Sequence, residues 1–189
     1  MQEQKLLTLP ITEVGNTLIY GMAGSGKENL ISTIVYSSML YHTASEVNYY
    51  ILDFGAETLK VFNDSPIVGD VLVSDDEEKI ENLFKNIHSL IEERKNLFAE
   101  YNGDYITYIK NSNNIVPAVI VIINNYESFY DSYSELEDKL IVLSRECSKY
   151  GIYFILSVTT PNGARFKLKQ NFSKQFVLGQ SNEDDYITI

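Results

Sequence analysis

Gly21-Met-Ala-Gly-Ser-Gly26-Lys27-Glu28 is the stretch that decides the fold. It follows the apolar run Thr17-Leu-Ile-Tyr20, which predicts a buried strand, and it opens a segment over 28–41 that predicts a helix. A Gly-x-x-x-x-Gly-Lys pattern between a strand and a helix is typical of a phosphate-binding loop. Its glycines let backbone N–H groups converge on an anion, and the lysine reaches the terminal phosphates. The residues expected to contact a nucleotide are Gly21, Gly24, Ser25, Gly26, Lys27 and Glu28.

The rest of the chain alternates short β-rich runs with longer helical periods. Further strands are expected over 48–54, 68–73, 118–123, 152–157 and 176–178. A long helix is expected from Asp75 or Asp76 to the Asn102-Gly103 pair, another over 135–150, and a helix or strand over 186–189. This alternation predicts an α/β fold with a mostly parallel central sheet flanked by helices.

Composition excludes several classes of protein. The chain has 189 residues, which suits one domain with a sizeable core, and a formal charge of −11 from 15 basic and 26 acidic residues. A DNA-binding protein needs a concentrated basic surface, so nucleic acid is not expected as a partner. The apolar run over 115–123 is too short for a membrane span, and the single cysteine, Cys147, fits a reducing compartment.

The motif departs from an active ATPase site at three positions. Glu28 stands where a hydroxyl residue normally ligates Mg²⁺, and the apolar strand over 119–123 ends in Asn124-Asn125 where an Asp-Glu pair is expected. An asparagine amide cannot accept a proton and is a poor ligand for a hard cation. Glu127 could substitute if it points back toward the loop. No catalytic residue is therefore assigned; Mg²⁺ binding is expected to be weak or absent, and ATP or ADP either binds weakly or not at all.

These pieces resemble the FtsK/SpoIIIE branch of P-loop ATPases over nearly the whole chain. The likeness rests on 21–28, Ile51-Leu-Asp-Phe-Gly55, 119–125 and 143–152. Arg145 matches the first of two arginines that the family carries before a Gly-Ile pair, whereas Ser148 stands where the second would be. Thr159-Thr160-Pro161 lacks the polar γ-phosphate sensor that the family often has there.

Within that branch the chain is similar to the tandem ATPase modules of type VII secretion proteins of the EssC/EccC kind. The shared features include 52–59, 66–71, Arg94-Lys-Asn-Leu-Phe98 and 165–172. The resemblance implies a RecA/FtsK-like P-loop NTPase fold and a single domain over residues 1–189, excised from a larger, multi-domain, membrane-anchored protein. The domain itself would lie on the cytoplasmic face of the membrane, which it meets only through the parent protein. The partners that it implies are neighbouring ATPase modules of the same chain and small helical-hairpin export substrates. It also implies that the parent protein can form a ring oligomer.

Three functions remain open. The chain could be a degenerate module, one of the later ones in the tandem array, with a structural, regulatory or substrate-recruiting role. It could be an active ATPase in which Glu28 and Glu127 take over the metal and base roles. It could be a DNA translocase module, against which the acidic composition argues. The three departures favour the first.

Overall fold

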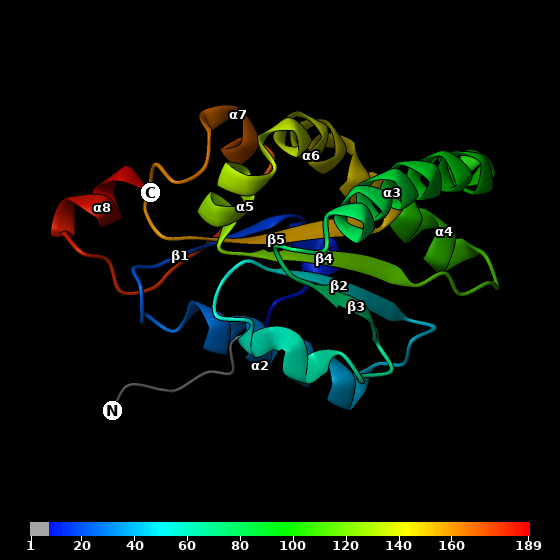
Figure 1. The fold of residues 1–189 in the computed structure, drawn as a ribbon. Coiled ribbons are helices and arrows are strands. Elements are labelled where there is room, and N and C mark those ends of the chain that lie inside the picture. Colours follow the sequence, from blue (N-terminus) through cyan, green and yellow to red (C-terminus); the bar gives the residue numbers. More distant parts are fainter. Residues whose placement is uncertain (1–7) are drawn as a thin grey trace, which may run out of the picture.

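The structure, a computed structural model, describes residues 8–189 and is built on one six-stranded sheet (Figure 1). The strands are β1 (Thr17–Tyr20), β2 (Val47–Asp53), β3 (Val68–Leu72), β4 (Ala118–Asn124), β5 (Ile152–Val158) and β6 (Lys174–Val177). They lie in the order β3-β2-β4-β5-β1-β6, and every pairing is parallel. The predicted parallel sheet is confirmed, and the carboxyl ends of its strands share one edge.

Helices cover both faces of the sheet. α2 (Lys27–Tyr41) lies on one face, and α3 (Glu77–Leu97), α5 (Tyr126–Ser132), α6 (Ser134–Glu146) and α7 (Phe166–Lys169) lie on the other (Figure 1). The remaining helical elements are α1 (Ile11–Val14), α4 (Tyr105–Asn111), α8 (Glu183–Thr188) and the 3₁₀ turns η1 (Thr58–Phe62), η2 (Ala99–Tyr101) and η3 (Cys147–Tyr150). Across residues 8–189, no helix combines the length and the apolar character needed to cross a membrane.

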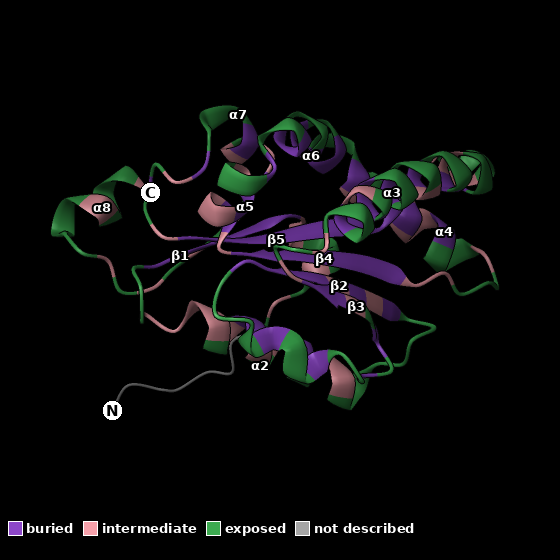
Figure 2. Ribbon diagram, in the orientation of Figure 1, coloured by how far each residue is buried: buried purple, intermediate pink, exposed green. Residues whose placement is uncertain are grey.

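The central strands form the core. β4 and β5 are buried along their whole length, between the two helical layers (Figure 2). Both are apolar except near their carboxyl ends because helices cover both faces of the sheet. β6, at the edge, alternates between half-buried and exposed side chains. The packing therefore places the ends of β4 and β5 beside the loop that follows β1.

The bounds of the predicted elements shift only slightly. Each expected strand forms within two residues of its predicted ends. The long helix ends at Leu97 and continues as η2, and the helix expected over 135–150 divides into α6 and η3. Asp76 precedes α3, but its carboxylate accepts a hydrogen bond from the Val73 N–H at 2.9 Å and does not cap the helix. The chain end expected as a helix or strand is α8.

Candidate nucleotide-binding site

The loop between β1 and α2 has the backbone that its glycines permit. Gly24 and Gly26 have φ of +76° and +94°, in the left-handed region that favours glycine. Gly26 directly precedes the first turn of α2, so the helix N-terminus opens toward the loop. A Cβ atom at Gly21 would collide with the hydroxyl of Ser25. Local sequence thus sets the loop shape, as the motif predicts.

Lys27 lies along this loop. Its Nζ donates hydrogen bonds to the carbonyl oxygens of Gly21 and of Met22, the latter at 3.1 Å. Burial lowers the pKa of Lys27 below its ordinary value, and the nearby carboxylates of Glu127 and Glu28 offset part of that change. The ammonium group is therefore held among loop carbonyls, which an incoming anion would replace as partner.

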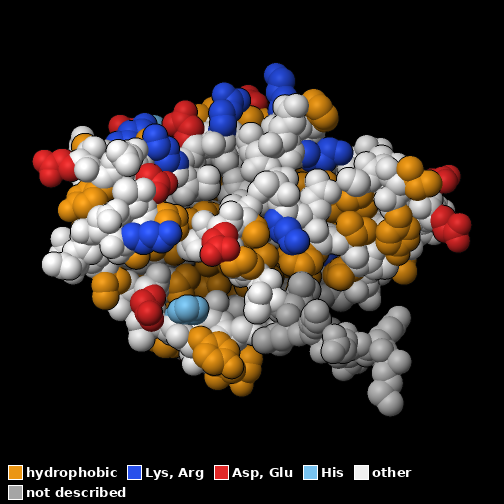
Figure 3. Space-filling model, turned by 180° about the vertical axis from the view of Figure 1, so that it is seen from behind, with side chains coloured by type: hydrophobic (Ala, Val, Ile, Leu, Met, Phe, Trp, Pro, Cys, Tyr) orange, Lys and Arg blue, Asp and Glu red, His pale blue; other side chains and the backbone are white. Residues whose placement is uncertain are grey.

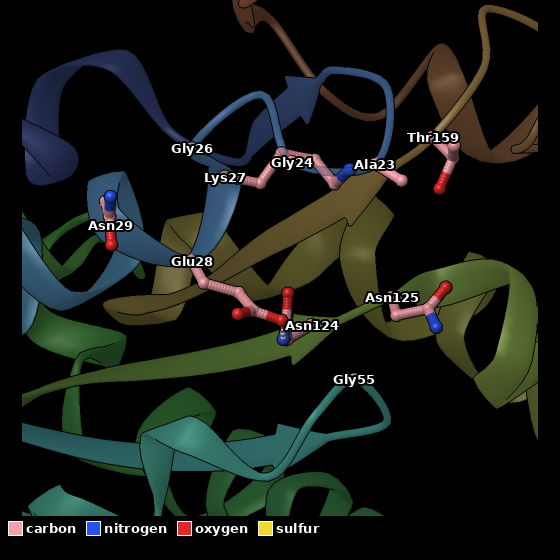
Figure 4. A pocket seen from close by; sticks show the side chains of 10 residues that line it. All are labelled: Ala23, Gly24, Gly26, Lys27, Glu28, Asn29, Gly55, Asn124, Asn125 and Thr159. Carbon is pink, nitrogen blue, oxygen red and sulfur yellow. Dashed lines mark hydrogen bonds between the residues drawn. The ribbon is translucent and has the colours of Figure 1, made fainter.

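A cavity of about 360 Å³ opens between the loop and the ends of β2, β4 and β5 (Figure 4). Six of the residues expected from the sequence line it: Gly24, Gly26, Lys27, Glu28, Asn124 and Asn125. The other lining residues are Ala23, Asn29, Gly55 and Thr159. Gly21, Ser25 and Glu127 are not among the lining residues; the Ser25 hydroxyl faces Gly21. The structure thus brings the loop and the two asparagines into one site.

Asn124, at the end of β4, is at the centre of a hydrogen-bonded cluster. Its Nδ2 donates to Asp53 Oδ1 at 2.9 Å and to Glu28 Oε1 at 3.3 Å, and its Oδ1 accepts from Ser157 Oγ at 2.8 Å. Figure 4 shows the Glu28 side chain extending from the start of α2 toward Asn124. Asp53 is buried and also accepts from the N–H groups of Gly55 and Leu59, both at 3.0 Å. The cluster joins the loop helix to the ends of β2, β4 and β5.

Asn125 and Glu127 serve other contacts. Asn125 Nδ2 donates to Phe54 O at 3.0 Å and to Ser128 Oγ at 2.7 Å. Glu127, in the first turn of α5, accepts the Thr159 N–H at 2.6 Å and the Thr160 N–H at 3.4 Å through Oε1. Its Oε2 is buried without a hydrogen-bond partner in the part of the chain that is described. The Glu127 carboxylate therefore stabilises the backbone that follows β5, beside the cavity.

The donor set does not fit Mg²⁺. In P-loop ATPases the loop hydroxyl and an acidic residue of the second motif hold the ion. Here Asn124 presents N–H donors to the Glu28 carboxylate, and both Asp53 oxygens already accept hydrogen bonds.

Asp53, Thr58 and Ser157 belong to the site although sequence reasoning did not select them as site residues. Asp53 ends β2 and Ser157 lies near the end of β5, while Thr58 Oγ1 donates to Glu28 Oε2 at 3.3 Å. The signal for the first two was available, because polar residues at the carboxyl ends of parallel strands meet at one edge. No pattern in the sequence marked Thr58.

The chain is similar in sequence and in structure to known proteins. The chain is 33% identical over 178 residues to the ESX secretion system protein YukB of Bacillus subtilis (strain 168), covering 94% of this chain and 12% of that protein. It superimposes on the solved cytoplasmic domain of EssC with a TM-score of 0.87 at 30% identity, covering 94% of this chain and 35% of that one. A structure of Thermomonospora curvata EccC (ATPases 2 and 3) in complex with a signal sequence peptide gives a TM-score of 0.83 at 26% identity, covering 90% and 32%.

The chain thus spans about an eighth of the length of YukB, and its likeness to EssC and EccC lies in their ATPase domains. The high TM-scores show that those domains share the overall fold described above. The FtsK/SpoIIIE family model matches residues 2–166, which include the loop, the cluster around Asn124 and β5. The chain belongs to the FtsK/SpoIIIE family.

Proposed function

We propose that this chain is a nucleotide-binding module of a type VII secretion motor that does not itself hydrolyse ATP. Its role would be structural, regulatory or substrate-recruiting within a longer protein. Neighbouring ATPase modules of the same chain are its expected partners, in a ring in the assembled protein. The module would work at the cytoplasmic face of the membrane.

One observation carries the proposal: the loop with Lys27 faces two amides, Asn124 and Asn125, in a single cavity. The loop retains two glycines at positive φ, a helix N-terminus that opens toward it, and a lysine, which are features that phosphate binding uses. An amide cannot take a proton from the attacking water, and a general base typically contributes about 10²- to 10⁴-fold to a rate. Glu127, the candidate substitute, accepts two backbone N–H groups through Oε1 and is not among the residues that line the cavity.

Calorimetric titration with ATP and ADP tests binding. We expect saturable micromolar binding to the wild-type chain, reduced at least about tenfold by Lys27→Ala because the variant removes the cation facing the phosphates. Lys85→Ala, at an exposed position on α3, is the matched control and should bind as the wild type does. Absence of heat up to millimolar nucleotide would refute nucleotide binding and leave the loop as architecture.

A turnover assay separates this proposal from an active ATPase. The isolated chain should release no phosphate above the background set by Lys27→Ala, with or without Mg²⁺. Mg²⁺-dependent turnover that Lys27→Ala abolishes and Glu127→Gln strongly reduces would instead favour hydrolysis with Glu127 as the base.

A substrate-recruiting role is favoured by the solved EccC relative, which holds a signal sequence peptide. The expected ligand class is the signal segment of a small helical-hairpin substrate. Titration of a fluorescent signal peptide, with and without ADP, would measure it. Peptide affinity that depends on nucleotide supports recruitment, whereas no peptide binding in either state restricts the module to a structural or regulatory role.

A further inference from the structure

We propose that Asn124 replaces the divalent cation of this site, so that nucleotide enters the cavity as a metal-free anion. The entry of a metal-free nucleotide rests on the proposed nucleotide binding. The replacement of the cation by Asn124 concerns only the cluster of Glu28, Asp53, Asn124 and Ser157. In this cluster, an amide N–H₂ group lies between two carboxylates.

The hydrogen bonds fix which way the amide faces. Ser157 Oγ accepts the Asn125 N–H at 2.8 Å, so its own hydrogen is free to bond Asn124 Oδ1 at 2.8 Å. The Nδ2 group must then face the two carboxylates. A flipped amide would instead place its oxygen against carboxylate oxygens, with no proton between them.

The two departures from the family motif compensate each other. A hydroxyl at position 28 and a carboxylate at position 124 would both offer oxygen ligands to one cation. In this chain Glu28 is a hydrogen-bond acceptor where the family has a hydroxyl, and Asn124 is a donor where the family has a carboxylate. The two side chains therefore bond each other directly at 3.3 Å. An N–H₂ group that points at this space repels a cation, and the amide oxygen is turned away toward Ser157.

Gly55 closes the cluster from the side of β2. A Cβ atom at this position would lie 2.7 Å from Asn124 Nδ2 and 2.7 Å from Glu28 Oε1. The backbone of Gly55 therefore packs directly over the bond between the two side chains.

Asn124→Asp is the direct test, with thermal unfolding as the readout. The variant replaces the donor with a third carboxylate beside Glu28 and Asp53, so the site gains repulsion and an oxygen ligand set at once. We expect its Tm to fall in EDTA and to recover by about 4 °C or more in about 10 mM Mg²⁺ or Ca²⁺, with no nucleotide present. The wild-type Tm should not respond to either ion.

Asn125→Asp is the matched control, because it adds the same charge at the next residue. The Asn125 side chain bonds Phe54 O and Ser128 Oγ instead of the two carboxylates. Its Tm is expected to fall without recovery in Mg²⁺ or Ca²⁺. Equal recovery of both variants, no recovery of Asn124→Asp, or a wild-type Tm that rises with the ions would overturn the cation replacement.

A second pair of measurements uses ADP and covers the case in which Asn124→Asp does not fold. Wild-type affinity for ADP should be no tighter in Mg²⁺ than in EDTA, because the protein offers no ligand to an Mg²⁺ ion that the phosphates hold. The double variant Glu28→Ser/Asn124→Asp restores the family ligand set and should bind ADP at least about tenfold more tightly in Mg²⁺. Tighter wild-type binding in Mg²⁺, or no gain in the double variant, contradicts the inference.

Failure of all chains to bind ADP would refute the proposed function, while the Tm measurements would still decide the role of Asn124.

Discussion

The charge on Lys27 should make nucleotide affinity depend on pH. Burial lowers the pKa of Lys27 in the free chain, whereas phosphate oxygens beside the ammonium would raise it in the complex. Binding then takes up protons, so the affinity is at its maximum below the free-chain pKa of Lys27 and falls as the pH rises through that pKa. The decline should begin below the ordinary lysine value of about 10.4 and approach about tenfold per pH unit above the free-chain pKa. Dissociation constants for ADP between about pH 7.5 and about pH 10, where the phosphates stay ionised, measure it.

Lys27→Arg provides the control for that profile. Guanidinium keeps its proton up to about pH 12, so the variant should show a flat profile over this range whatever affinity it retains. The comparison therefore uses slopes and not absolute affinities. A wild-type slope equal to that of Lys27→Arg would show that the Lys27 ammonium does not control binding.

Sequence reasoning identified single residues more reliably than their partners. The loop motif predicted Gly24, Gly26, Lys27 and Glu28, all of which line the cavity. Asn124 was noted as the loss of a metal ligand, but its bonds to Asp53 and Ser157 depend on the pairing of β2, β4 and β5. Sequence order does not give that pairing, because residues 53, 124 and 157 come from three separate strands.

At the scale of elements, Arg94 ties α3 to the amino-terminal side of the sheet. The side chain is buried, and its guanidinium donates to Tyr150 O at 2.6 Å, Gly151 O at 3.2 Å and Pro117 O at 2.6 Å. These carbonyls directly precede β4 and β5. Burial lowers the pKa of Arg94, yet a guanidinium remains charged at any pH that a folded protein meets. One planar group thus holds two central strands and the longest helix.

Loss of Arg94 should cost more stability than loss of the exposed Arg145. Arg94→Ala leaves three carbonyl groups without their donor, and we expect it to lower the free energy of unfolding by about 3–5 kcal/mol. Arg94→Lys keeps the charge but not the fork geometry, and should cost about 1–3 kcal/mol. Arg145→Ala, exposed on α6, is the control and should stay within about 0.5 kcal/mol. Urea unfolding checks the order; equal losses for Arg94→Ala and Arg145→Ala would contradict this account.

Four short helices were not predicted from the sequence. α1, α4, α5 and α7 contain four to seven residues, too few to show a helical period. α5 begins at Tyr126, and Tyr126 and Phe129 are buried in the core, so these two aromatic residues serve packing. The long period of α3 and the continuous apolar runs of β4 and β5 were readable because burial on a fixed face repeats over many residues.

At the scale of the whole molecule, strand order connects the loop to the asparagines. β5 lies between β1, which leads into the loop, and β4, which ends at Asn124. Ser157 and Thr159, near the end of β5, therefore lie between the two halves of the cavity, and Glu127 holds the backbone of Thr159. This contact links α5 to the backbone that follows β5, at the edge of the cavity.

The charge of the whole chain opposes a DNA translocase role. The formal charge is −11, and in the view of Figure 3 the Lys and Arg side chains are scattered among Asp and Glu and form no continuous stripe. Duplex binding draws on neutralisation of many phosphates by a contiguous basic surface, and non-specific dissociation constants are then about 10⁻⁴ to 10⁻⁶ M. We expect fluorescence anisotropy to show no binding of a labelled duplex of about 30 base pairs by about 50 μM chain at about 0.15 M salt.

Lowering the salt tests the reason for this result. Binding that appeared and weakened steeply with rising salt would reveal a basic face assembled from distant residues and would revive the translocase, whereas absence of binding down to about 0.05 M salt would leave the acidic surface as sufficient cause.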